Sequence, residues 1–390
     1  MNTEQLDRIK KLQDGVRTIV ESPENERRIA FWEKQEGDAR DHWRGIPKRG
    51  SRKAPFYADC ENSMWSRILG FDLKEYYNDP AVYLESQLRM MLFRFRNFDD
   101  DACAGKVVPI WLGVPFEPSF FGVEVVFEPG ADPWIGKKPV INDESDLARL
   151  PRPDFYKSGL MPVAHRLYSG IGELLDEDFT VAFPEWGRSP FAVALHLRGM
   201  DRIVMDMYDR PSFVRELINF IAECRMEWTR ERFKFMKTLI QPGNLYNDEV
   251  NCPLLSPGMY RDFVLPSEQR LSAFHGGIAY WHSCGNTTDL MRYIKEIPNL
   301  RMFHRGPWTD LNAAVEVFGP DIAIEICLDP ASDIQMATEE SMRQQVEWIK
   351  ATCDGRVDYT IRIEGSVIDS ADKALQKVKQ YVDVTRSVLG

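Results

Sequence analysis

The stretch Ile278-Ala279-Tyr280-Trp281-His282-Ser283-Cys284-Gly285-Asn286 is an apolar run that ends in two metal-ligand side chains and a glycine. Side chains alternate between the two faces of a strand, so a strand over this run places His282 and Cys284 on the same side. An imidazole and a thiolate side by side supply half of a catalytic zinc site. Thr287 then begins helix-capping sequence. The pair therefore lies on a strand-to-helix loop, where barrel enzymes carry their catalytic groups.

Short apolar segments alternate with amphipathic helical patterns on both sides of this stretch. Strands are predicted at residues 106–113, 180–184, 244–249, 278–281, 300–304, 322–327 and 357–363. This alternation is typical of parallel βαβ units in the α/β class. Roughly seven or eight such units predict a TIM (β/α)8 barrel. We expect an N-terminal helical extension over 1–105, with a loop at 45–59, and the barrel over 106–390.

The composition indicates an ordinary globular protein. Of the 390 residues, 44% are apolar and 28% are charged, which allows a sizeable core. A formal net charge of -11 argues against nucleic acid as a partner. The polar start and the lack of any run of about 18 apolar residues predict neither a signal peptide nor a membrane span. Seven cysteines without framework spacing fit reduced thiols, and we expect a cytoplasmic protein.

Several further motifs resemble, in order, those of the uroporphyrinogen decarboxylase superfamily. They are Ser189-Pro190-Phe191, Asn247-Asp248-Glu249, Leu255-Ser256-Pro257, Phe263-Val264-Leu265-Pro266, the His282-Ser283-Cys284-Gly285-Asn286 segment and Leu328-Asp329-Pro330. This superfamily includes true decarboxylases, thiol-dependent methyltransferases and methyl-donor-cleaving proteins of corrinoid systems. True decarboxylases carry an arginine-rich segment after a Pro-Val-Trp strand, whereas Pro109-Ile110-Trp111 is followed here by residues without arginine. The resemblance therefore implies the methyltransferase branch.

The resemblance also implies a zinc site. Zinc methyltransferases of the superfamily use His-x-Cys and a distant Cys-Gly, which assigns His282 and Cys284 as two ligands. The distant position carries Glu364 here, and a carboxylate is a competent zinc ligand. Cys327, at the end of the preceding strand, is the competing third ligand, because barrel strands deliver their last residues to one mouth. The alternatives are that Cys327 is a buried apolar side chain and that Glu364 forms a salt bridge with Arg362 or Arg343.

Two further groups of residues are candidates for catalysis and substrate binding. Asp248 and Glu249 follow a predicted strand and are placed for proton transfer or for orienting a metal ligand; the alternative is an acidic loop. Aromatic side chains wall an apolar pocket for an aromatic methyl ether, or else belong to the core; they are Trp111, Phe116, Trp186 and Trp281.

The implied activity is transfer of a methyl group from a methoxylated small molecule to the Co(I) corrinoid of a separate protein, with zinc as Lewis acid. The nearest match to the corrinoid signature Asp-x-His-x-x-Gly, at residues 40–45, has arginine in place of the aspartate. A corrinoid protein must therefore bring the cobamide. The alternatives are methyl transfer from methyl-cobamide to a thiol and a noncatalytic barrel that acts as a scaffold. Association into a homodimer is left open.

Overall fold

The computed structural model describes residues 3–34, 43–128 and 130–390. Residues 40–42 of the candidate corrinoid signature lie outside this part of the chain. Strands and helices alternate as expected, and the barrel-type α/β fold is confirmed. The parallel strands that build it are β3 (Phe56–Cys60), β4 (Val107–Pro109), β7 (Thr180–Ala182), β8 (Gly243–Tyr246), β9 (Ile278–His282), β10 (Met302–Arg305), β11 (Ala323–Cys327) and β12 (Tyr359–Gly365).

Two sets of parallel strands make up the wall. Six strands pair in the order β3-β12-β11-β10-β9-β8, and β4 pairs with β7. A parallel bridge between Arg188 and Tyr246 connects the segment after β7 to the end of β8. The carboxyl ends of all these strands therefore face one mouth, which is where the sequence analysis expects the site. Two small antiparallel pairs lie outside the wall: β1 (Trp32–Glu33) with β2 (Ile46–Pro47), and β5 (Val125–Val126) with β6 (Trp134–Ile135).

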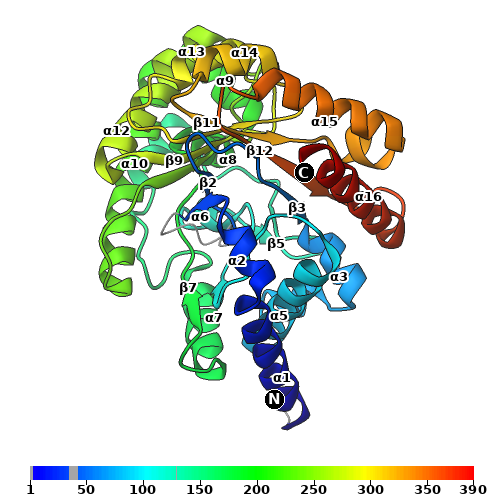
Figure 1. Cartoon of the computed structure of the whole chain (residues 1–390). Coiled ribbons are helices and arrows are strands. Elements are labelled where there is room, and N and C mark those ends of the chain that lie inside the picture. The colour runs from blue at the N-terminus through cyan, green and yellow to red at the C-terminus, as the bar shows by residue number, and fades with distance from the viewer. Residues whose placement is uncertain (1–2, 35–42, 129) are drawn as a thin grey trace.

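Helices cover the outside of the strands. In chain order the α-helices are α1 (Thr3–Val20), α2 (Pro23–Ile29), α3 (Asn62–Leu69), α4 (Leu73–Tyr76), α5 (Pro80–Asn97), α6 (Phe116–Ser119), α7 (Met161–Leu174), α8 (Pro190–Arg198), α9 (Met200–Asp209), α10 (Pro211–Met236), α11 (Pro257–Met259), α12 (Leu265–His275), α13 (Met291–Ile294), α14 (Leu311–Phe318), α15 (Glu339–Cys353) and α16 (Ala371–Leu389). Figure 1 shows α15 and α16 side by side next to β12, with α1 projecting from the opposite end. Among the described residues, no helix combines the length and apolarity needed to cross a bilayer.

The N-terminal part of the chain corrects one prediction. The expected loop over 45–59 ends in β3, which pairs in parallel with β12 from Phe56 opposite Ile361 to Cys60 opposite Gly365. The sheet thus begins about fifty residues before the boundary expected at 105/106. The Pro, Gly and Lys residues that precede Phe56 mask the short apolar strand in the sequence.

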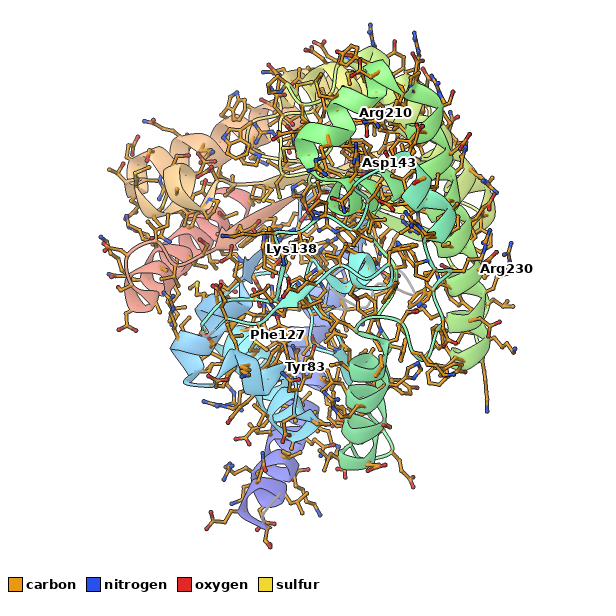
Figure 2. The ribbon with its side chains drawn as sticks, turned by 180° about the vertical axis from the view of Figure 1, so that it is seen from behind. Tyr83, Phe127, Lys138, Asp143, Arg210 and Arg230 are labelled. Atoms are coloured by element: carbon orange, nitrogen blue, oxygen red, sulfur yellow. The ribbon has the colours of Figure 1, made fainter. Side chains whose placement is uncertain are left out.

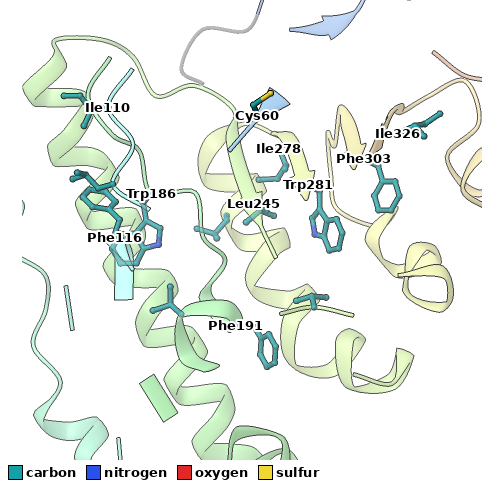
Figure 3. Packing of buried hydrophobic residues seen from close by; sticks show 14 of the residues in the cluster. Cys60, Ile110, Phe116, Trp186, Phe191, Leu245, Ile278, Trp281, Phe303 and Ile326 are labelled. Atoms are coloured by element: carbon teal, nitrogen blue, oxygen red, sulfur yellow. The ribbon is translucent and has the colours of Figure 1, made fainter. Parts of the chain in front are cut away.

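Alternation along β9 separates a core face from a site face. Trp281 stacks on Phe303 of β10 with ring centroids 5.6 Å apart, and Figure 3 shows the two side by side among buried apolar residues. Phe303 in turn stacks on Phe318 of α14, so this face is directed toward the helices. Tyr280 and His282 lie on the opposite face, inside the barrel. The sequence therefore delivers His282 to the interior because its neighbour Trp281 belongs to the core.

Candidate active site

Three metal-ligand side chains meet at the ends of β9 and β10. His282 is the last residue of β9, Cys284 follows two residues later, and His304 lies in β10. Phe303 is in register with Trp281, so His304 lies beside His282, and their ring centroids are 4.0 Å apart. One ligand atom from each of the three lies within 4.8 Å of the others. Of the His, Cys, Asp and Glu residues in the described ranges, these three form the group suited to a metal ion.

The His282 ring is oriented by contacts at both nitrogens. Its Nδ1 lies 3.2 Å from the hydroxyl of Tyr280, two residues earlier on the same strand face. Its Nε2 lies 3.3 Å from the Cys284 sulfur and 3.0 Å from Asp248 Oδ1. This nitrogen therefore points to the place where a metal would be shared with the thiol.

The two ring nitrogens of His304 have different surroundings. Its Nδ1 lies 2.8 Å from Glu325 Oε2 and 2.9 Å from the Tyr280 hydroxyl, whereas its buried Nε2 has no hydrogen-bond partner among the described residues. A carboxylate at one ring nitrogen fixes the tautomer and leaves the other for a metal. Burial, together with His282, lowers the pKa of His304 to about 3, so the ring is neutral as a ligand must be.

Glu325 is the buried charge that orients His304. It accepts hydrogen bonds from the hydroxyls of Tyr57 and Tyr280, and Arg44 Nη2 lies 3.2 Å from its Oε1. Burial alone would raise the pKa of this carboxyl, but Arg44 and His304 hold it well below the usual range. Glu325 is consequently an anion held on fixed partners, able to keep the His304 ring in one orientation.

The donor set fits a zinc-type ion. Burial, followed by the charges of Asp248 and Glu364, raises the pKa of the Cys284 thiol well above its ordinary value. A cation at this position would stabilise the thiolate and would satisfy the unpartnered Nε2 of His304. Two imidazoles and one thiolate with an open fourth position match a catalytic zinc site.

Glu364 and Cys327, the expected third ligands, lie at the end of β12 and β11 and contact each other. The Cys327 sulfur is 3.1 Å from Glu364 Oε2, and Arg362 Nη2 is 3.4 Å from the same oxygen. Neither residue belongs to the group formed by the two histidines and Cys284. The salt bridge expected as the alternative for Glu364 is therefore present.

The two carboxylates after β8 have different surroundings. Asp248 lines the site, 3.0 Å from His282 Nε2 and 3.4 Å from Arg188 Nη2. Glu249 instead accepts two bonds from Arg188 Nη1, at 2.6 and 2.8 Å, and lies 2.6 Å from His196 Nε2. Burial opposes its ionisation, but Arg188 and His196 lower the pKa of Glu249. Asp248 is thus the carboxylate next to His282, whereas Glu249 holds Arg188.

A cavity of about 300 Å³, here called the site cavity, opens onto these groups. His282, Cys284, Asp248 and Glu364 line it. Of the four predicted aromatic wall residues, two line it and two do not. Trp111 and Phe116 are in its wall, whereas Trp186 packs against Phe120 and Trp228 in the core, and Trp281 faces the helices.

A family model described as uroporphyrinogen decarboxylase (URO-D) matches residues 61–383. The chain belongs to the uroporphyrinogen decarboxylase family. Among solved structures, a methyltransferase from Methanosarcina mazei has a similar fold, with a TM-score of 0.64 and 14% sequence identity over 87% of this chain and 95% of that chain. No curated protein matches.

The wall of the site cavity carries more carboxyl groups than guanidinium groups. Arg188 and Arg362 are its two guanidinium groups, and both contact carboxylates of the protein. The carboxyl groups in the wall outnumber them; they belong to Glu61, Glu117, Asp132, Glu185, Asp248 and Glu364. Such a wall is unfavourable for a multiply charged anion.

His304 and Glu325 are the site residues that sequence reasoning missed. The predicted strand over 300–304 already ended at His304, and neighbouring barrel strands deliver their last inward residues to the same mouth. The position of His304 at the end of a predicted barrel strand is therefore the signal that could have identified it. Glu325 carried a weaker signal, as one charged residue inside an otherwise apolar strand.

Proposed function

We propose that this family member is a methyltransferase that moves a methyl group from a methoxylated small molecule to the Co(I) corrinoid of a separate protein. In this proposal His282, Cys284 and His304 hold a zinc ion. The assignment replaces the third ligand expected at Glu364 or Cys327 with His304. The observation that carries it is the buried Nε2 of His304, which no described residue hydrogen-bonds although Glu325 fixes Nδ1 of the same ring.

Cleavage of a methyl ether requires help for a poor leaving group. When bound, zinc supplies a Lewis acid for the ether oxygen. The protein contributes the orientation of the ligands, since Tyr280 and Glu325 fix the two imidazole rings. Trp111 and Phe116 supply apolar wall that excludes water from the methyl group.

Asp248 is the residue proposed to carry a proton to the departing oxygen. Its side chain is 37% exposed, which leaves it accessible from the cavity, and its Oδ1 lies 3.0 Å from His282 Nε2. Arg188 restrains the other carboxylate oxygen at 3.4 Å and is itself held by Glu249. Asp248 is therefore positioned next to the metal ligands without being fully buried.

The methyl acceptor is proposed to arrive on a partner. The sequence near residues 40–45 lacks the aspartate of a corrinoid signature, so the cobamide belongs to a separate corrinoid protein that approaches the mouth. The similar solved structure is itself named a methyltransferase, which supports the reaction class. Methyl transfer in the opposite sense, from methyl-cobamide to a thiol, uses the same metal and is the second outcome that an assay must separate.

Metal content and methyl transfer test the proposal together. We expect about one zinc per chain in the purified protein, retained in His275→Ala and Cys224→Ala and lost in His304→Ala and Cys284→Ala. The controls replace a buried histidine and a buried cysteine outside the site. Demethylation of a methoxylated aromatic in the presence of Co(I) cobalamin should follow the metal. Full metal content in His304→Ala would refute the ligand set. If the only reaction seen is transfer from methylcobalamin to a thiol, the proposed direction of methyl transfer is wrong.

A further inference from the structure

A second cavity, of about 160 Å³, lies between β3 and β4 and adjoins the site cavity. We call it the side chamber. Helix α5 forms much of its outer wall, through Gln87, Met90, Met91 and Arg94. The residues that line both the side chamber and the site cavity form the boundary between them; they are Glu61, Trp111, Asp132, Arg362 and Glu364.

The side chamber exists because β3 and β4 are not paired in the described sheet. Side chains satisfy the free edge of β3 in place of a neighbouring strand. Asp101 and Asp100 accept hydrogen bonds from the backbone N–H groups of Phe56 and Ala58, at 3.1 and 2.9 Å. Arg94 Nε donates to the Ala58 carbonyl at 3.1 Å. The strands can therefore stand apart without leaving buried backbone groups unsatisfied.

Polar side chains in the chamber wall are bonded to other parts of the wall. Gln87 Nε2 donates to the Tyr76 hydroxyl at 2.5 Å, and the Tyr83 hydroxyl donates to the Pro109 carbonyl at 2.9 Å. The rings of Tyr76 and Tyr83 stack with centroids 4.3 Å apart, and Figure 2 labels Tyr83 in this part of the molecule. The remaining wall combines aromatic and sulfur-containing side chains with charged ones. The former include Trp43, Trp65, Met90, Met91 and Phe95, and the latter are Asp59, Glu61, Arg94, Asp132, Arg362 and Glu364. An occupant would still meet mainly apolar surface.

We propose that the side chamber binds the aromatic ring of the methyl donor and so selects monocyclic aromatic ethers. This inference rests on the proposed function for the methyl transfer, but the binding of a ring does not. A dry apolar cavity of about 150 Å³ accepts one benzene molecule. The side chamber, at about 160 Å³, has room for one ring of that size. The shared boundary, which includes Trp111 and Glu364, lies between a ring held there and the site cavity that His282 and Cys284 line.

Gly105 offers a direct way to fill the side chamber. It lines the chamber, and a Cβ built on it meets no atom of the described residues within 4 Å. We expect wild-type protein to bind benzene and anisole in a ligand-observed NMR titration. Gly105→Leu should weaken both by about tenfold or more, because the new side chain occupies the space of the ring. Gly172→Leu is the matched control, since Gly172 is exposed on α7 and also has open space at its Cβ.

A second variant, which enlarges the side chamber, tests the inference even if Gly105→Leu does not fold. Met91→Ala removes a side chain from the chamber wall, and it should admit naphthalene, which the wild type excludes. Failure of wild-type protein to bind benzene, or equal binding by Gly105→Leu, would overturn the inference. Ring binding that responds to Gly105→Leu and Met91→Ala, without any methyl transfer, would leave the side chamber established and refute the proposed function.

Discussion

The two sides of the barrel wall differ in strand pairing. We call the side from β8 to β12 the paired wall and the side at β3 and β4 the open wall. From β8 to β12 the strands pair without a break, and this continuous wall carries His282, Cys284 and His304. In the described part of the chain β3 and β4 do not pair, and side chains cap this edge of β3 around the side chamber. Strand register fixes ligand positions closely, whereas a gap closed by side chains provides space. In our two proposals, the paired wall holds the metal ion and the open wall selects the methyl donor.

Replacing Asp100, which caps the free edge of β3 in the open wall, should have the largest effect on stability. Its fully buried carboxylate lies 3.1 Å from Arg28 Nη1 and 3.2 Å from Arg94 Nη2, and it accepts the Ala58 N–H. Asp100→Ala leaves the Arg28 guanidinium buried without this partner, so we expect a loss of about 3–5 kcal/mol in urea denaturation. Asp99→Ala is the control, because the Asp99 side chain is 64% exposed. Equal stability of the two variants would contradict the edge-capping account.

Replacing Glu268, which lies behind the paired wall, should alter the pH dependence of the free energy of unfolding. Burial raises the pKa of Glu268 to about 7, and this carboxyl accepts hydrogen bonds from Tyr260, Asn247 and the indole of Trp281 behind β9. Because the pKa of Glu268 is higher in the folded protein than in the unfolded chain, protonation of this carboxyl favours folding. The stabilisation is fully present below the pKa of the unfolded chain and is lost as the pH rises through the folded-state pKa of about 7. The shift corresponds to about 3 kcal/mol.

We therefore expect the wild type to lose stability between about pH 4.5 and 7 through this group. Glu268→Gln should remove that part of the pH dependence in urea denaturation at pH 5 and pH 8. Glu231→Gln, at an exposed position of α10, should keep the wild-type profile. A Glu268→Gln profile parallel to that of the wild type would show that Glu268 is ionised in the fold at both pH values.

Much of the paired wall could be predicted from the sequence, and less of the open wall. The apolar run before His282 and the two-residue spacing to Cys284 specify a strand and a shared face. His304 is a single histidine without a motif, and only the register between β9 and β10 shows that it reaches the same point. Trp281 looked like pocket wall because composition does not tell which face of a strand is the core.

The open wall escaped prediction for a different reason. Phe56 to Cys60 is short and follows a polar, glycine-containing segment, so its strand character depends on pairing with β12, which is distant in the sequence. Glu249 illustrates the same limit: its role depends on Arg188 and His196, neither of which its own motif identifies. Long-range partners, rather than local pattern, decide such positions.

Replacing Glu325 should weaken the metal site while leaving the side chamber intact. Glu325→Gln removes the charge that orients His304 Nδ1, and outer-shell partners of this kind are worth about 10–100-fold in metal affinity. Competition with a chelating dye measures the effect. Tyr57→Phe removes one hydroxyl donor to Glu325 but not the contact with His304, so its loss should be smaller. Unchanged metal affinity in Glu325→Gln would show that Glu325 does not support metal binding through His304.

Replacing Arg188 should lower activity with the smallest change in structure. Arg188→Met frees Asp248 and leaves Glu249 with His196, so we expect methyl transfer to fall by about tenfold through misplacement of Asp248. Zinc content should stay at the wild-type level, because the ion pairs of Arg188 among the described residues are with Asp248 and Glu249 and not with the three proposed ligands. The exposed Arg152→Met variant provides the control. Loss of zinc in Arg188→Met would instead make Asp248 part of the metal site.

X-ray absorption at the zinc edge tests the central claim most directly. We predict two nitrogen ligands at about 2.0–2.1 Å and one sulfur at about 2.3 Å in the wild type. The spectrum of His304→Ala should show loss of one nitrogen or of the metal, while that of Glu364→Ala should match the wild type. A wild-type spectrum with a single nitrogen, or one that changes in Glu364→Ala but not in His304→Ala, would return the third ligand to Glu364 and contradict the assignment of His304.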